Sequence, residues 1–119
     1  PVQELTLAAE GVSAGVDLYH FRHDNYRIVL DMQEMPVTPA GHHYELWLTG
    51  SDGEVPVGSF RIKAEDRFTN AWVLGVDPVD FPNLVLTVEP NDGDPSMSDT
   101  VLARTAIDPD HVYHGRYDE

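Results

Sequence analysis

Apolar and polar side chains alternate in short segments along this chain, and residues 26–32 show the alternation most regularly. Successive side chains of a β-strand point to opposite faces, so this pattern predicts a strand with one face in a core. Asp24 and Asn25 tolerate the backbone of tight turns and are expected to join this strand to a preceding one as a hairpin. The core-facing side chains are expected to be Tyr26, Ile28, Leu30 and Met32.

The segment at residues 41–48, GHHYELWL, is predicted to be a central strand. A proline-rich turn at residues 35–40 precedes it, and a turn around residues 52–53 follows it. Trp47 has the opposite parity to the aliphatic row, so its indole must be covered by another segment, either the N-terminal strand or a long loop. The side chains expected to face the core are Tyr44, Leu46 and Leu48.

Six further segments carry strand-forming patterns between turn residues: 3–8, 16–23, 55–62, 68–74, 84–89 and 100–107. Residues 11–15 are expected to form a loop of small residues. The apolar residues of segment 16–23 have mixed parity, which suggests a bulge or burial on both faces. The parity also changes at Gly58-Ser59, which predicts a bulge there.

No segment has a convincing helical period, so the predicted fold class is all-β, an antiparallel β-sandwich of about eight short strands. A chain of 119 residues has the size of one domain. We expect a single sandwich domain at residues 1–107, with a polar turn at residues 64–67. Residues 108–119 are expected to form a polar C-terminal tail.

The composition excludes several classes of protein. Lys and Arg number 7 against 21 Asp and Glu, which gives a formal net charge of −14. Phosphate backbones and anionic lipid surfaces repel such a chain, so no nucleic-acid partner is expected. The chain has no cysteine, and hence no disulfide or cysteine-based zinc site. It has no apolar run near the ~20 residues of a membrane helix and no signal sequence, and its start at Pro1 suggests a trimmed piece.

Histidines and one acidic loop are the candidate metal ligands. The histidines are His20, His23, His42, His43, His111 and His114, and no spacing among them makes a chelating pair on one strand face. The loop at residues 91–99 offers the oxygen ligands that Ca²⁺ prefers, but not the spacing of a calcium-hand loop. We interpret Asp92, Asp94 and Asp99 as a solvated acidic turn whose cation binding stays open, and we predict no metal site.

No motif in the sequence predicts catalysis. The chain lacks a serine in a nucleophile elbow and a Gly-rich phosphate cradle. A small hydrolase would need two carboxylates that converge in a cleft, and sequence spacing singles out no such pair. We therefore predict no catalytic residue and no cofactor.

Trp47 and Trp72, with His43 and Glu45 nearby, offer a platform for a sugar or peptide, although burial of both rings is the favoured interpretation.

Four motifs follow one another in an order that resembles a known family. They are MPVTPAG at residues 35–41, YELWL at 44–48, VGSF at 57–60 and LTVEP at 86–90, the last followed by an Asp/Gly/Pro loop. Together they are similar to the C-terminal domain of the anti-sigma-K factor (RskA-type) family, over roughly residues 26–107. The sequence departs from the family pattern at residues 91–98, where NDGDPSMS replaces the usual Gly-Gly and Pro-Thr residues.

The resemblance implies a regulatory or sensory domain outside the cytoplasmic membrane, anchored by a helix that this chain does not contain. In such proteins a cytoplasmic part holds an alternative sigma factor inactive, and regulated proteolysis releases it. The expected partner is then a membrane or extracytoplasmic protease, with the sigma factor bound only by the missing part. The alternative is a secreted or surface-exposed module that binds a peptide or glycan. Neither function is enzymatic.

Overall fold

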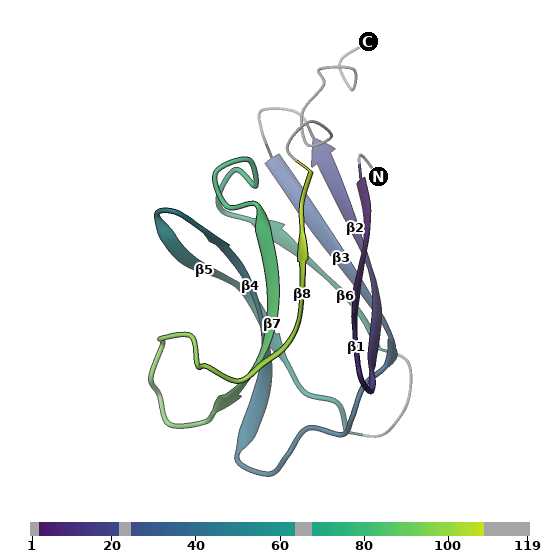
Figure 1. The fold of residues 1–119 in the computed structure, drawn as a ribbon, viewed down its shortest axis with the longest axis vertical. Helices are drawn as coiled ribbons and strands as arrows, with labels where there is room; N and C mark the ends of the chain where they lie inside the picture. Colours follow the sequence, from purple (N-terminus) through teal and green to yellow (C-terminus); the bar gives the residue numbers. More distant parts are fainter. Residues whose placement is uncertain (1–2, 22–24, 64–67, 109–119) are drawn as a thin grey trace.

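The computed structural model describes residues 3–21, 25–63 and 68–108, which form eight strands in two antiparallel sheets (Figure 1). The first sheet has the order β1 (Gln3–Ala9), β2 (Val12–Phe21), β3 (Asn25–Glu34) and β6 (Phe68–Leu74). The second has the order β5 (Gly53–Phe60), β4 (His42–Gly50), β7 (Asn83–Pro90) and β8 (Val101–Ala106). The described residues contain no helix, and thus none long and apolar enough to cross a membrane. The predicted all-β class is confirmed.

The inner faces of the two sheets share one apolar core, and the strands that alternate most regularly supply its centre. The expected inward rows of β3 and β4 are confirmed, because all of these side chains are at most 1 % exposed. They are Tyr26, Ile28, Leu30 and Met32 of β3, and Tyr44, Leu46 and Leu48 of β4. The predicted central position of β4 is also confirmed, since β5 and β7 flank it.

The edges of the two sheets approach each other, so the sandwich is partly closed at its sides. The edge strand β1 runs alongside the edge strand β8 (Figure 1). Gln3 at the start of β1 also holds the backbone just after β8. Its Oε1 accepts a hydrogen bond from the Asp108 amide at 2.8 Å, and its Nε2 donates to the Asp108 carbonyl at 3.1 Å.

Strand β2 begins earlier than the sequence indicates. The expected loop at residues 11–15 is wrong, because Val12 already pairs with Ala9 of β1 and only Gly11, with φ +76°, keeps a turn conformation. The mixed parity of segment 16–23 comes from aromatic rings on the outer face. The rings of Tyr19 and Phe21 stack there at 6.4 Å. The bulge lies instead where Ser13 and Ala14 pair with Glu34 and Met32, so that Gln33 of β3 is the extra residue.

Strand β5 is shifted relative to its predicted range of residues 55–62. Gly58 lies opposite Leu46 and Pro56 lies opposite Trp47, so the extra residue is Val57, one position before the predicted bulge. Ile62 is buried beyond the end of the strand, where its amide donates to Thr38 Oγ1 at 2.7 Å.

Three predicted segments fall wholly or partly outside the described residues. They are the turn at residues 64–67, Asp24 of the hairpin connection, and the tail after its first residue.

A Gly58→Ala substitution is expected to destabilise the fold by about 1–3 kcal/mol, the usual cost of overpacking. A Cβ atom at residue 58 would overlap the indole of Trp72, which packs across β5 against the core. Urea denaturation measures the effect. Gly15→Ala is the matched control on β2, since its Cβ meets nothing within 4 Å, and it should be neutral or stabilising by up to about 1 kcal/mol. Equal effects of the two substitutions would contradict the packing of Trp72 on Gly58.

Candidate functional site

A groove on the outer face of the second sheet brings several candidate residues together. The β7–β8 loop, residues 91–100, borders this face, and an open space of about 330 Å³ lies between them. We call this space the outer groove. Its walls include His43, Glu45 and Trp47 of β4, Glu89 of β7, and Asp94 and Pro95 of the loop.

Trp47 forms the floor of the outer groove and is not an exposed platform. The side chain lies on the predicted second face of β4 and is only 4 % exposed. Its indole Nε1 donates to Thr87 Oγ1 at 2.9 Å, so the polar edge of the ring has a partner within the sheet. The side chain is covered from the side of the β7–β8 loop, which agrees with the expectation that a long loop covers it. The N-terminal strand lies in the other sheet and does not cover it.

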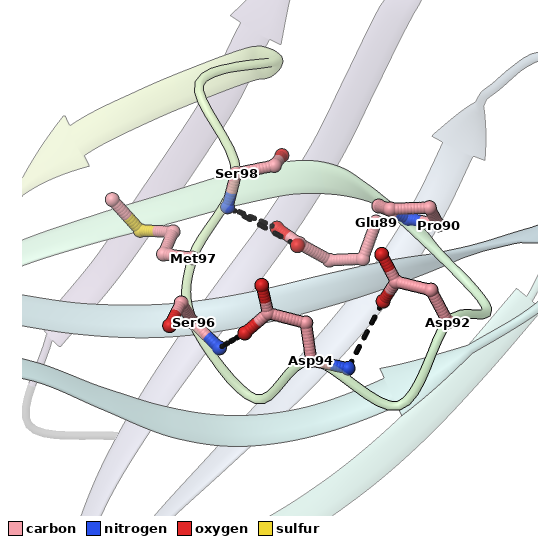
Figure 2. A pocket seen from close by; sticks show the side chains of 7 residues that line it. All are labelled: Glu89, Pro90, Asp92, Asp94, Ser96, Met97 and Ser98. Carbon is pink, nitrogen blue, oxygen red and sulfur yellow. Dashed lines mark hydrogen bonds between the residues drawn. The ribbon is translucent and has the colours of Figure 1, made fainter.

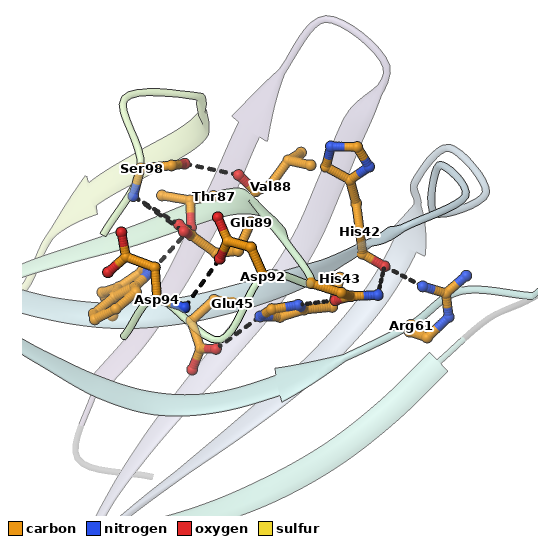
Figure 3. A network of polar contacts seen from close by, with 12 residues as sticks. His42, His43, Glu45, Arg61, Thr87, Val88, Glu89, Asp92, Asp94 and Ser98 are labelled. Carbon is orange, nitrogen blue, oxygen red and sulfur yellow. Dashed lines mark hydrogen bonds and ion pairs between the residues drawn. The ribbon is translucent and has the colours of Figure 1, made fainter. Parts of the chain in front are cut away.

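A buried chain of hydrogen bonds runs from Trp47 to the end of the loop (Figure 3). The Thr87 hydroxyl accepts from the indole and donates to Glu89 Oε2 at 2.5 Å. The Ser98 amide donates to Glu89 Oε2 and Oε1 at 3.0 and 3.1 Å, and Ser98 Oγ donates to the Val88 carbonyl at 2.7 Å. A carboxylate that is 4 % exposed needs such donors, and here they fasten the loop to β7.

The acidic residues of the loop hold its own backbone (Figure 2). Asp92 Oδ1 accepts from the Asp94 amide, and Asp94 Oδ1 accepts from the Ser96 amide, each at 2.9 Å. These are Asx turns, and Gly93 between them has φ +79°. The Ser96 backbone and side-chain hydrogen bonds lower the pKa of Asp94, which favours its charged form. A second, smaller cavity of about 90 Å³ lies under the loop, lined in part by Asp92 and Met97.

The other end of the loop is fastened to β4 through His43. Its Nδ1 donates to Asn91 Oδ1 at 2.6 Å, and its Nε2 lies 3.5 Å from Glu45 Oε1 (Figure 3). The Asn91 amide donates to the Gly41 carbonyl at 2.8 Å. Arg61 donates to the carbonyl of the neighbouring His42. Both ends of the β7–β8 loop are therefore fixed, so the outer groove has a preformed shape.

The pKa of Glu45 is raised, chiefly because burial disfavours its charged form and further because the Glu89 carboxylate faces it. His43 opposes this shift by its charge and its hydrogen bond. A carboxyl whose pKa is higher in the folded state than in the unfolded state binds protons more readily when folded. Its contribution to stability is present below the unfolded pKa and is lost as the pH rises through the folded pKa.

A Glu45→Gln substitution is therefore expected to become relatively more stabilising as the pH rises. The glutamine resembles the protonated acid, so the gain over the parent should be larger at about pH 7 than at about pH 4. Urea denaturation at the two pH values measures this difference. Glu54→Gln on the exposed part of β5 is the control and should show a smaller dependence. A gain that shrinks with rising pH would show that the His43 interaction outweighs burial.

The other candidate residues either lie away from the outer groove or fall outside the described residues. Trp72 is half-buried against Phe60, with ring centroids 6.1 Å apart, so the platform of exposed tryptophans is wrong. His20 is buried and stacks on Tyr26 at 4.3 Å. Within residues 3–21, 25–63 and 68–108, no three His, Asp or Glu side chains are placed to hold a metal ion. His23, His111 and His114 lie outside the described residues.

The outer groove contains one pair of neighbouring carboxylates, the feature that a small hydrolase would need. Glu45 and Glu89 do meet at the outer groove, a convergence that sequence spacing did not reveal. Both oxygens of Glu89 accept hydrogen bonds from the loop and from Thr87, so this side chain has a structural role. One signal in the sequence pointed to it. Thr87 and Glu89 have the opposite parity to Leu86 and Val88 and hence share the outer face with Trp47.

One protein family matches most of this chain. The family described as "Anti-sigma-K factor rskA, C-terminal" matches residues 2–104. No curated protein matches the chain, and no solved structure does. The family match covers every described strand up to the middle of β8, including the outer groove and the β7–β8 loop.

Proposed function

Since the chain belongs to the anti-sigma-K factor RskA C-terminal family, we propose that it is the extracytoplasmic regulatory domain of a transmembrane anti-sigma factor. In this proposal the domain shields a cleavage site near the membrane while it is folded. Loss of the shield permits regulated proteolysis by a membrane or extracytoplasmic protease, which frees an alternative sigma factor. The anchoring helix and the sigma-binding part belong to other segments of the full protein.

The family match over residues 2–104 is the observation that carries this proposal. The fold suits the role, because a sandwich with one continuous core unfolds as a unit and can act as a switch for access to a nearby segment. No catalytic step is required of the domain. The Glu89 carboxylate holds the β7–β8 loop by its hydrogen bonds to the Ser98 amide.

The glycan or peptide module based on exposed aromatics is not proposed. Trp47 is 4 % exposed and Trp72 packs over Gly58 and against Phe60, so neither ring offers a free face of the kind that sugars stack on.

Labelling of a single cysteine in intact cells tests the proposed location. The chain itself has no cysteine, and Ser51 is exposed in the turn between β4 and β5. The full-length protein carrying Ser51→Cys should react with a membrane-impermeant maleimide without permeabilisation, whereas the parent protein should not gain label in this domain. Labelling that appears only after the cells are lysed would overturn the proposal.

A further inference from the structure

The outer groove has the size of a side-chain pocket. Its volume of about 330 Å³ is at the lower end of the ~300–1,000 Å³ that is typical of ligand sites. It opens on the outer face of the sheet, so a chain passing over the surface can insert one long side chain. It is also preformed, because Glu89 and His43 fasten the two ends of the β7–β8 loop. A preformed site loses less conformational entropy on binding.

The charges around the outer groove favour a cation. Glu45, Glu89 and Asp94 contribute carboxylates, and His43 is the one basic side chain among the lining residues. Asp94 accepts hydrogen bonds only from Ser96 of its own loop, and the Glu45 carboxylate has His43 as its basic neighbour, among the described residues. Burial, and then the nearby Glu89 carboxylate, raise the pKa of Glu45, and His43 offsets only part of this shift. A cation that enters the groove relieves this repulsion.

The apolar walls favour a cation with an extended apolar stem. The groove is also lined by Pro56, Pro90, Pro95 and Trp47. A methylene stem can lie against such rings while its charged head reaches the oxygens. Among the natural side chains, arginine combines this stem with a planar, weakly hydrated head whose five N–H donors match carboxylate oxygens. A bare metal ion would make no use of these walls.

From the cavity, its charges and its apolar walls we infer that the outer groove binds an arginine side chain presented by an extended segment of a partner protein. The inference does not depend on the proposed function, which assigns no residue of this domain to partner recognition. It gives the groove a ligand of defined chemistry. It also gives the net charge of −14 a role in steering a basic segment towards this face.

Titration of the ¹⁵N-labelled 119-residue chain with acetyl-AARAA-amide tests this inference. The indole N–H of Trp47 and the amides of Asp94 and Ser96 should shift in a saturable manner. A matched peptide with neutral citrulline in place of arginine should bind at least about tenfold more weakly, because it keeps the shape and loses the charge. Equal binding of the two peptides would overturn the inference.

Matched variants separate binding in the groove from attraction by the net charge. Glu45→Gln and Asp94→Asn should each weaken the arginine peptide by about fivefold or more, a typical effect of losing one charged contact. Asp92→Asn removes the same charge from the same loop but lines only the smaller cavity, and it should change the affinity by less than about twofold. Each of the three keeps its hydrogen-bond acceptor, so the loop should stay folded.

Two further outcomes would each overturn the inference. If Asp92→Asn weakens the peptide as much as Asp94→Asn, the peptide responds only to the overall negative charge. If calcium chloride alone shifts the same three resonances and displaces the peptide, the groove is an inorganic cation site. The result that supports the inference is binding that needs arginine, depends on Glu45 and Asp94, and persists in the presence of calcium.

Discussion

Replacing Leu46 by alanine should lower the free energy of unfolding by about 2–5 kcal/mol, the range observed for leucine truncations in tight cores. Leu46 is fully buried and lies in the middle of a row that crosses the second sheet, with Gly58 of β5 on one side and Leu86 of β7 on the other. Because a strand flanks β4 on each side, the backbone there has little freedom to close the cavity. Urea denaturation followed by circular dichroism measures the loss.

Leu5→Ala is the matched control for this substitution. Leu5 is half-buried on the edge strand β1, so the same chemical change removes less buried surface and should cost about 1 kcal/mol or less. If both variants lose the same stability, β4 is not the centre of the core.

Replacing Trp47 by alanine should cost about 3–5 kcal/mol, although this side chain lies outside the core between the sheets. The substitution removes the floor of the outer groove and the indole donor to Thr87. Its effect should therefore extend beyond stability to the anchoring of the β7–β8 loop. Amide hydrogen exchange at Ser98, whose N–H is bonded to Glu89, should become faster relative to amides in the core strand β3.

Trp47→Phe separates packing from hydrogen bonding at this position. Phenylalanine keeps most of the apolar contact and loses the N–H donor, so it should cost less than alanine and still more than about 0.5 kcal/mol. A Trp47→Ala variant that loses little stability and leaves exchange at Ser98 unchanged would contradict the account of the buried polar chain.

Strands β3 and β4 were predictable from the sequence because a single property, the parity of the apolar residues, determines which side chains a sheet buries. Strand β2 shows where that reasoning fails. Tyr19 and Phe21 are large and apolar, but they lie on the outer face, where they stack on each other and Phe21 lies under the Arg27 guanidinium at 5.0 Å. Local contacts of this kind leave no periodic signal. Small strand residues such as Ala14 are likewise hard to distinguish from a loop.

The outer groove was only partly predictable. The sequence pointed to Trp47 as a side chain that needs cover, and to Asp92 and Asp94 as an acidic turn. It did not show that Glu89 is buried, because that depends on the loop folding back so that the Ser98 amide meets the carboxylate. The position of Gly58 under Trp72 was hidden for the same reason, since β5 and β6 belong to different sheets. Contacts between segments far apart in sequence are set by the topology.

The most direct test of the central proposal is transcription from a promoter that depends on the cognate sigma factor. Cells should carry the full-length anti-sigma factor with Leu46→Ala, and the parent protein and Leu5→Ala serve as references. If the folded domain shields a cleavage site, Leu46→Ala should raise transcription in the absence of any inducing signal, and Leu5→Ala should leave it near the parent level. Unchanged transcription with Leu46→Ala, in cells where limited proteolysis shows the domain to be unfolded, would contradict the proposal.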